Sequence, residues 1–431
     1  MLIKRRGRPP SAGMSVAALD IGTHKVCCLI AALEPSPRNG SSMMPRLRVL
    51  GLGHQRSQGI AGGVVVDLAL AQSAVAAAVA QAEHAAGFTI DQVYVGVTGG
   101  NPRSRTFNGH VDLPQGIVGD ADVARLDAGA RDFAGGRTGG LLTINRIAFG
   151  LDATPAIREP RGLAGRRLRA NHHAITVEPG PLQNLCMLVA SCHLGVVELI
   201  PAAYASALAS TTEDERRLGV TCIDIGAGVT SIAGFADGHF VHGSSVPFGG
   251  QHVTSDIAHT LAIPLAEAER IKTLYGSLAV SASDEHDLVP VARVCDHAQV
   301  ARVATRAEVG RLLARRHGSL LAGVRASLDG CGVERIRTSA IVLTGGASQL
   351  MGLEAWAVSV LQRPVRVAVP PRLDGGAGRL SSGASSRAFA CVVGLALAAC
   401  GPSPWISAGD DGRPARQGYL GRVEQWLKES F

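Results

Sequence analysis

Two carboxylates occupy equivalent places in two separate stretches of the chain. Asp20 lies in the stretch 16–30, and Asp224 lies in the stretch 220–233. In each stretch an apolar run ends in Asp-Ile-Gly, passes through small residues and returns to a second apolar run. This is the pattern of a strand, a tight turn and an antiparallel return strand. The sequence therefore predicts two β-hairpins, each with a carboxylate at the end of its first strand.

Such a pair of turns is suited to binding the phosphates of a nucleotide. Glycine lets backbone N–H groups approach a phosphate closely, and a carboxylate at the strand end can hold the hydrated Mg²⁺ that accompanies a nucleotide. A third element, residues 340–350, is again an apolar strand that runs into a Thr-Gly-Gly-Ala turn. One such turn is ordinary loop chemistry, whereas the set of three indicates a nucleotide site.

The composition indicates a large globular protein with more than one core. The chain has 431 residues, of which 46% are hydrophobic and 18% are charged, so it can bury two large lobes or several subdomains. Its net charge is +7, but four positive charges lie in a Pro-containing head before Met14: Lys4, Arg5, Arg6 and Arg8. The charge of the remainder does not indicate a nucleic-acid partner.

Cysteine usage and hydropathy favour the cytosol. The nine cysteines include no Cys-x-x-Cys pair, and several lie within apolar strands, where they resemble small buried hydrophobic residues. No apolar run reaches the ~20 residues needed to span a bilayer. The basic head leads into a strand interrupted by Asp20 and not into the apolar core of a signal peptide, so we do not expect secretion.

The rest of the pattern alternates strands and helices. A long Ala-rich helix is expected to open near Asp67 and to end near Gly87. The stretch from about 92 to about 170 carries its own strand and helix signals, which predict an inserted subdomain. Further strands are expected over 49–60, 92–98, 109–113, 141–144 and 172–177, and helices over 121–133, 183–193 and 198–210.

The full set of motifs resembles the FtsA family of bacterial cell-division proteins, which are actin-like ATPases. Actin and the sugar kinases use three strand-to-glycine elements in this order to hold the phosphates and the adenosine. The resemblance covers nearly everything from Met14 to Phe431 and is carried by the stretches 56–60, 63–68, 97–100, 103–105, 157–165, 212–219, 253–258 and 266–272. It implies an α/β, actin-like (ribonuclease H-like, duplicated) ATPase fold with an inserted subdomain 1C and a C-terminal amphipathic helix.

The resemblance also implies a division of the chain into ten segments. In order, these are a basic extension (1–13), the first part of subdomain 1A with the first hairpin (14–86), the inserted subdomain 1C (87–170), the second part of 1A (171–197), the first part of 2A with the second hairpin (198–248), subdomain 2B (249–318), the second part of 2A with the adenosine motif (319–386), the closing helix of 1A (387–400), a flexible linker (401–417) and an amphipathic membrane-targeting helix (418–431).

Carried over to this sequence, the family's motifs imply that ATP and Mg²⁺ are the ligands. Asp20 and Asp224 would face Mg²⁺ through water. The residues implied to contact the nucleotide are Asp20, Gly22, Thr23 and Lys25 in the first phosphate loop, Asp224, Gly226, Gly228 and Thr230 in the second, and Gly345, Gly346 and Ala347 in the adenosine turn.

Two further positions are implied by the resemblance. Glu269 and Lys272 lie on an expected helix where related ATPases reach the ribose and adenine, although a Glu/Lys pair three residues apart is also a common surface salt bridge. Asp224 and Gln183 are the candidate catalytic residues. Gln183 is suggested by its helix position alone, and a neutral amide can orient an attacking water.

The sequence departs from the family pattern at two places. The second loop carries Val229 where the family usually has Thr, so a hydroxyl that could face a phosphate is missing. One lost contact costs on the order of 1 kcal/mol, so we expect nucleotide binding with at most slow hydrolysis. Arg146 stands where relatives carry a more apolar passage, and the sequence offers no reason for it.

The C-terminal end is expected to bind a membrane surface. Residues 401–417 lose apolar periodicity and hold three prolines and three glycines, which is typical of a flexible tether. The segment 418–431 then places its apolar side chains on one helical face: Tyr419, Leu420, Val423, Trp426, Leu427 and Phe431. Fourteen residues make only ~21 Å of helix, too short to cross a bilayer, so the helix would lie in the lipid interface or, alternatively, dock on its own core.

We therefore expect a peripheral protein on the cytoplasmic face of the inner membrane at the division septum. The resemblance implies that it self-associates, binds the C-terminal peptide of FtsZ through 2B, and contacts later division proteins through 1C. Two other classes share the same nucleotide motifs: a sugar or acid kinase, and an adaptor of the pilus-assembly type. A kinase would need a further catalytic Asp in the cleft, and the sequence shows strand-end Asp residues only in the two hairpins.

Overall fold

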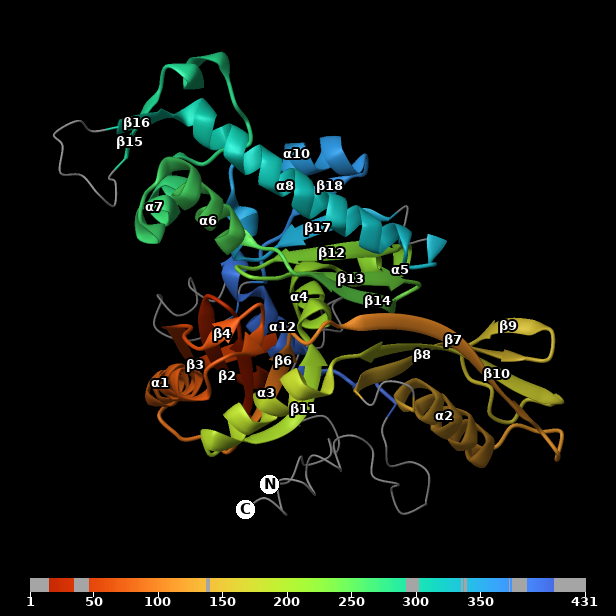
Figure 1. Ribbon diagram of the computed structural model, residues 1–431. Coiled ribbons are helices and arrows are strands. Elements are labelled where there is room, and N and C mark those ends of the chain that lie inside the picture. The colour runs from red at the N-terminus through yellow and green to blue at the C-terminus, as the bar shows by residue number, and fades with distance from the viewer. Residues whose placement is uncertain are drawn as a thin grey trace.

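The computed structural model describes residues 15–34, 46–136, 140–291, 302–334, 336, 339–371, 373 and 386–406. This part of the chain forms two lobes, one above the other in Figure 1, and a third body that extends sideways. No helix within these ranges is both long and apolar enough to cross a membrane. The predicted basic extension and the predicted amphipathic helix, with Tyr419 to Phe431, lie outside the described residues.

A five-stranded sheet in the order β11-β6-β1-β2-β3 forms the centre of the first lobe. β1 and β2 are the two strands of the first predicted hairpin, β3 continues the antiparallel part, and β6 and β11 are parallel to β1. Every residue of β1 after Ser15 is buried. The bounds are β1 (Ser15–Ile21), β2 (Lys25–Glu34), β3 (Arg46–Arg56), β6 (Gln92–Val97) and β11 (Gly195–Pro201).

The sheet of the second lobe repeats this plan in the order β14-β13-β12-β17-β18. β12 and β13 form the second predicted hairpin, β14 is antiparallel to β13, and β17 and β18 run parallel to β12. The two lobes are therefore a duplicated unit. The bounds are β12 (Val220–Ile225), β13 (Thr230–Ala236), β14 (His239–Val246), β17 (Ala340–Thr344) and β18 (Val365–Val367).

Two short apolar helices, α4 (Ala202–Ser210) and α12 (Ala390–Cys400), pack against each other between the lobes (Figure 1). A Cβ atom at Gly394 of α12 would lie only 1.7 Å from the carbonyl oxygen of Ala205 on α4. Only glycine permits this backbone contact. Between the two lobes, α4 and α12 therefore cross in close contact, because the residues at the crossing point are Ala205 and Gly394.

The long Ala-rich helix α1 (Leu68–Ala86) matches its predicted signals and packs on β2 and β3. The carboxylate of Asp67 accepts a hydrogen bond from the backbone N–H of Leu70 at 3.0 Å, and Gly87 closes the helix in the left-handed conformation. Just before it, the hairpin of β4 (Ile60–Ala61) and β5 (Val64–Val65) turns through Gly62 and Gly63, both with positive φ.

The second lobe carries most of its helices above its sheet in Figure 1. The helix α8 runs across the lobe, and α6 and α7 lie beside a small hairpin of β15 and β16. The bounds are α5 (Glu213–Leu218), α6 (Gly250–Leu261), α7 (Leu265–Tyr275), η1 (Ala282–Glu285), β15 (Leu288–Val291), β16 (Arg302–Thr305), α8 (Arg306–Asp329), η2 (Gly346–Gln349), α10 (Leu353–Leu361) and, before α12, η3 (Arg387–Phe389).

The body at the side is a four-stranded sheet in the order β7-β10-β8-β9 with the helix α2 on one face (Figure 1). Leu126 of α2 packs there with Phe149 and Leu168. The structure also explains Arg146, whose guanidinium pairs with Asp127 of α2 and lies 4.3 Å from the centre of the Phe149 ring. The bounds are β7 (Arg103–Asp112), α2 (Asp120–Gly135), β8 (Leu141–Leu151), β9 (Thr154–Ile157) and β10 (Arg167–Thr176).

Strand pairing places several boundaries differently from the sequence-based ones. β6 pairs with β1, so the inserted body begins after Val97 and not at residue 87. β10 pairs with β7 and β8, so this body extends to Thr176 and not only to 170. Residues 198–201, expected to begin a helix and the second lobe, complete β11, and the cut at 318 falls inside α8. Periodicity finds apolar strands but not the sheets that they join.

The start of the predicted linker is packed against the fold. The backbone N–H of Ile406 donates a 2.8 Å hydrogen bond to the carbonyl of Ile144, and the ring of Trp405 lies 4.9 Å from that of Tyr204. The described residues 401–406 therefore belong to the folded core, which corrects the predicted linker start at 401. The sequence did not reveal this, because a single partly buried Trp among prolines and glycines gives no periodic signal.

Candidate functional site

The first hairpin turns tightly beyond Asp20. The backbone N–H of Gly22 donates to the carbonyl of Lys25 at 3.0 Å, which closes the four-residue turn. The Thr23 hydroxyl accepts a 3.1 Å hydrogen bond from the backbone N–H of Gly63, in the turn between β4 and β5. The first loop is thus held from outside by a second glycine turn.

The second hairpin makes the same turn with other residues. The N–H of Gly226 donates to the carbonyl of Val229 at 3.0 Å, so Val229 occupies the place of Lys25. The carbonyls of Gly226 and Ala227 accept hydrogen bonds from Gly250 and Gln251, at 2.9 and 2.8 Å. The second loop therefore rests on the first turn of α6.

The two phosphate loops contact each other at Thr23 and Gly228. A Cβ at Gly228 would lie 2.6 Å from the Thr23 hydroxyl, and a Cβ at Gly345, where φ is +91°, would lie 2.2 Å from Oδ1 of Asp224. Because these glycines have no Cβ, a bound phosphate could approach the backbone closely here. The carboxylates of Asp20 and Asp224 supply the oxygen donors that Mg²⁺ prefers, so these residues fit a metal-bound nucleotide.

Charge is concentrated around Asp20. Its side chain is only 9% exposed, and burial raises its pKa, which the Lys25 ammonium opposes. The Lys25 ammonium donates a hydrogen bond to the carbonyl of Ala388 and lies 3.8 Å from the centre of the Phe389 ring. The buried thiol of Cys391 hydrogen-bonds with Asp20. The first carboxylate and Lys25 therefore both lie beside the start of α12.

Asp224 has a different environment. Burial raises its pKa to about 6, the nearby Asp20 charge adds to this, and a hydrogen bond from Ser206 and the charge of Lys25 oppose it. The Ser206 hydroxyl, on α4, donates to Oδ2 of Asp224 at 2.5 Å. The helix between the lobes therefore contacts the second carboxylate directly.

Glu269 and Lys272 of α7 lie against α6, beside the second loop. The Lys272 ammonium lies 2.7 Å from Oε2 of Glu269 and donates to the hydroxyl of Thr254 and the carbonyl of Gly250, at 2.8 and 3.1 Å. Burial favours a raised pKa for Glu269, but hydrogen bonds from Lys272 and Thr254 hold it below its usual value, aided by His24 of the first loop. The pair therefore contacts the first turn of α6, on which the second loop rests, and its role toward a nucleotide stays a prediction.

The third glycine turn closes this end of the cleft. Gly345 lies against Asp224, Gly346 lies near Ala388, and a Cβ at Gly250 would approach that of Ala347 to 3.0 Å. Thr230, in contrast, donates its hydroxyl to the carbonyl of Phe248 at 2.8 Å and is fully buried. Its hydroxyl supports the loop in this structure.

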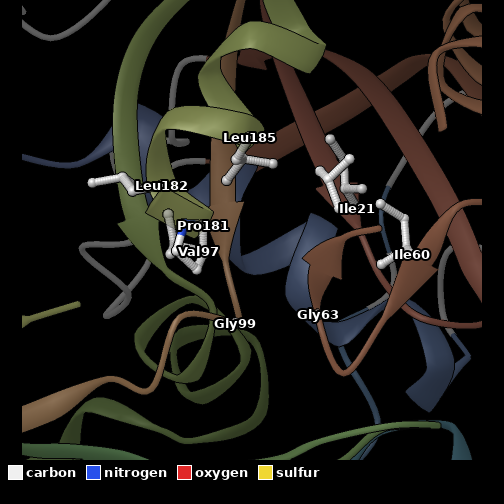
Figure 2. Close-up of a pocket in the computed structure, with 9 residues that line it drawn as sticks. Ile21, Ile60, Gly63, Val97, Gly99, Pro181, Leu182 and Leu185 are labelled. Atoms are coloured by element: carbon white, nitrogen blue, oxygen red, sulfur yellow. The ribbon is translucent and has the colours of Figure 1, made fainter. Parts of the chain in front are cut away.

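Gln183 lies on α3 (Pro179–Ser191), which borders the first loop. Figure 2 shows a small apolar pocket there, in which Pro181, Leu182 and Leu185 of α3 face Ile21 at the end of β1 and the glycine turn at Gly63. Among the described residues Gln183 makes no hydrogen bond to either phosphate loop. Its proposed role stays a prediction.

Sequence analysis missed four residues of the cleft. Ser206, Thr254 and Cys391 hold or face the predicted groups but belong to no glycine turn, and His24 lies within the first turn without having been named. Ser206 left one signal, because it is a polar residue within the buried, Ala-rich stretch 202–210.

Two family models match the chain. The model of the cell division protein FtsA matches residues 221–394, and that of the SHS2 domain inserted in FtsA matches residues 99–176, the range of the inserted body. Cell division protein FtsA of Rhizobium meliloti (strain 1021) is 36% identical over 437 residues, which cover 98% of this chain and 96% of that protein. The chain belongs to the FtsA family.

Other FtsA proteins match over similar lengths. That of Agrobacterium fabrum (strain C58) is 34% identical over 425 residues, covering 96% of this chain and 95% of that protein. That of Escherichia coli (strain K12) is 31% identical over 387 residues, covering 88% and 89%. This chain is therefore related to cell-division proteins along most of its length.

Solved structures identify the fold as actin-like. The PilM-PilN type IV pilus biogenesis complex contains a chain with a TM-score of 0.61 and 16% identity, covering 90% of this chain and 100% of that one. MreB5 of Spiroplasma citri bound to ADP gives a TM-score of 0.51 at 15% identity, covering 89% and 95%. At these identities the likeness concerns the fold alone.

Proposed function

We propose that this FtsA-family chain binds ATP with Mg²⁺ between its lobes, self-associates, and tethers FtsZ filaments to the cytoplasmic face of the inner membrane at the septum. The observation that carries the nucleotide part is the facing pair of hairpin turns, in which Gly228 meets Thr23 and the first strand of each hairpin carries a carboxylate just before the turn. Membership of the cell-division family supports the division role.

Each group in the cleft has a distinct task in this proposal. The backbone N–H groups of both loops bind phosphate oxygens, and Asp20 and Asp224 hold the metal through water. Lys25 exchanges its contact with the Ala388 carbonyl for a phosphate. Glu269 and Lys272 bind the ribose and adenine beside the Gly345–Ala347 turn. With Val229 in the second loop and only Gln183 to orient water, hydrolysis is slow.

A binding test addresses the nucleotide part first. We expect calorimetry to detect ATP binding that weakens when Mg²⁺ is removed by EDTA. A steady-state phosphate release on the order of 10 s⁻¹, typical of metabolic enzymes, would instead favour a kinase. If the wild-type chain bound no nucleotide, the actin-like ATPase function would be excluded.

The region around α7 and β15 is the proposed contact for the C-terminal peptide of FtsZ. Three leucines are exposed there, Leu265, Leu274 and Leu288, which is the kind of apolar surface that a peptide can cover. Leu265→Glu with Leu274→Glu should abolish co-sedimentation with FtsZ polymers. Leu218→Glu is the matched control, because Leu218 is 82% exposed on α5, away from this region. Equal losses in both variants would exclude this contact.

The tail is the proposed membrane anchor. Burial of half the apolar area of its side chains is worth roughly 4 to 7 kcal/mol, and self-association would multiply this through effective concentration. Trp426→Glu or truncation after Gly418 should release the protein from vesicles while ATP binding persists, and a foreign amphipathic helix should restore attachment. Full vesicle binding by the truncated chain would contradict the proposal.

Co-sedimentation with FtsZ polymers also separates this function from that of a pilus-type adaptor, which would fail to co-sediment with FtsZ.

The inserted body is the proposed contact for later division proteins and for neighbouring subunits. Its sheet is covered by α2 on one face, while Arg167 and Arg169 of β10 are exposed. Deletion of this body should leave FtsZ binding intact and abolish the recruitment of later division proteins.

A further inference from the structure

We propose that α4 positions Asp224 for the metal-bound nucleotide through Ser206, and that Trp405 sets α4 from its other side. The nucleotide site and the segment that leads to the tail would then be coupled. This inference rests on the proposed nucleotide binding and adds to it two positioning residues, neither of which belongs to a glycine turn.

The first step is the contact between Ser206 and Asp224. The Ser206 hydroxyl is fully buried and donates to Oδ2 of Asp224 at 2.5 Å. Asp224 sits between the second hairpin and β17, where Gly345 approaches its other oxygen. With one oxygen held by Ser206, the carboxylate cannot rotate freely, so its second oxygen keeps a defined position beside Gly345. A charge-assisted hydrogen bond of this kind is among the stronger ones in proteins.

The second step is the placement of α4 itself. Seven of its nine residues are buried alanines or serines, and Ala205 is in backbone contact with Gly394 of α12. Small side chains provide few interlocking contacts, so the large ones decide how the helix is rotated. Tyr204 and Leu208 are the two large side chains of α4.

Tyr204 is held by an aromatic cluster that includes the end of the described chain. Its ring lies 5.2 Å from that of Phe240 on β14 and 4.9 Å from that of Trp405, and the Trp405 and Phe240 rings are 6.0 Å apart. Aromatic pairs at these separations attract beyond their buried area. Removal of the Trp405 ring would leave Tyr204 with only the Phe235 and Phe240 rings as partners and would weaken the placement of α4.

Trp405 is fixed by contacts with the inserted body and the first lobe. Trp405 bridges to Asn145 and Ile406 donates to the carbonyl of Ile144, both on β8. The Ser403 hydroxyl donates to Glu198 on β11 at 3.2 Å. Tyr204 and Ser206 are two residues apart on one helix and so point to nearly opposite sides. A rotation of α4 would therefore change the contact of Tyr204 with Trp405 and the contact of Ser206 with Asp224 at the same time.

Ser206→Ala tests the first step. We expect an approximately tenfold loss of affinity for Mg²⁺-ATP, since a charge-assisted hydrogen bond is removed, and a much smaller loss for ATP in EDTA. Ser210→Ala is the matched control, because the buried Ser210 hydroxyl, on the same helix, has no hydrogen-bond partner within the described ranges. An affinity of Ser206→Ala within twofold of wild type, or the same loss with and without Mg²⁺, would overturn the positioning role.

Trp405→Ala tests the second step. We expect a threefold to tenfold loss of Mg²⁺-ATP affinity, the equivalent of one or two aromatic contacts, and near wild-type affinity in Trp405→Phe. In a background with Trp356→Phe and Trp426→Phe, the emission of Trp405 should change when Mg²⁺-ATP is added, and Ser206→Ala should reduce that change at saturation. If the two sites are coupled, Trp405 must affect Mg²⁺-ATP affinity and Mg²⁺-ATP must affect the surroundings of Trp405, because coupled sites influence each other equally.

The outcomes of these experiments distinguish a failure of the coupling from a failure of the proposed nucleotide binding. Absence of ATP binding by the wild type would remove both. Normal ATP binding, together with an unresponsive Trp405 and unchanged affinity in Trp405→Ala, would leave the nucleotide site intact and overturn the coupling alone. Thermal unfolding of every variant identifies losses that come from misfolding.

Discussion

The two phosphate hairpins share one backbone turn and differ in nearly everything attached to it. In both, the glycine after Asp-Ile donates to the carbonyl three residues later, at 3.0 Å. The first turn carries Thr23, His24 and Lys25, while the second carries Ala227, Gly228 and Val229 at the same positions. Duplication preserved the geometry and allowed the chemistry to diverge.

This difference assigns separate tasks to the two loops. The first contributes side chains, since Lys25 carries charge, His24 faces Glu269 and Thr23 meets the opposite loop. The second has almost no polar side chain and is instead supported by α6 and α4. We infer that the first loop supplies the charge for a bound nucleotide and the second supplies a rigid backbone surface.

The largest expected effect comes from breaking what the loops share. Asp20→Ala removes the metal-facing charge, and Gly346→Asp places a carboxylate beside the nucleotide. Each should lower ATP affinity by about a hundredfold or more, measured by calorimetry. Gly346→Ala is the control for the second change, because a Cβ there meets only the Ala388 side chain at 3.7 Å. Unchanged affinity in both Asp20→Ala and Gly346→Asp would contradict the actin-like site.

The next effect tests the charge that distinguishes the first loop. Lys25→Met gives that position an apolar side chain, as in the second loop. We expect a tenfold to hundredfold loss of ATP affinity, the usual range for a charge-assisted phosphate contact, and little change for adenosine. Similar losses for ATP and adenosine would show that Lys25 only supports α12.

A smaller effect tests the contact between the loops. Gly228→Ala places a methyl group 2.6 Å from the Thr23 hydroxyl, so the loops must move apart. Overpacking of this kind costs about 1–3 kcal/mol, and ATP affinity should fall about tenfold. Gly129→Ala on α2 has open space around it and serves as the control. Wild-type affinity in Gly228→Ala would show that the loops separate at no cost.

The smallest effect concerns the missing hydroxyl of the second loop. Val229→Thr restores it, and one added hydrogen bond contributes on the order of 1 kcal/mol. ATP affinity or turnover should rise up to about fivefold, measured by calorimetry and phosphate release. A decrease in both would mean that the buried Val229 side chain is needed for packing.

Glycine turns made the phosphate loops predictable, because the motif and the backbone geometry coincide within a few residues. Asp20, Gly22, Asp224 and Gly345 lie where sequence analysis expected strand ends and turns. α1 was equally clear, since Asp67 and Gly87 mark its ends. Local chemistry decides these features, so a single sequence contains them.

Contacts between distant segments were not predictable. Nothing in the sequence reveals that Ser206 meets Asp224, that Thr254 joins Glu269 and Lys272, or that β10 belongs to the inserted sheet. Each depends on which elements lie side by side, and apolar periodicity does not encode that. Trp405 was misassigned to a flexible linker for the same reason.

The docking of Ile406 determines how closely the folded core can approach a membrane. If residues 418–431 bind lipid as proposed, only residues 407–417 remain between the core and the bilayer, a tether with an average span of about 17–20 Å. Every subunit would then face the bilayer with the same side. A filament of such subunits would carry its anchors along one edge, and the bending of the filament and of the membrane would become mechanically linked.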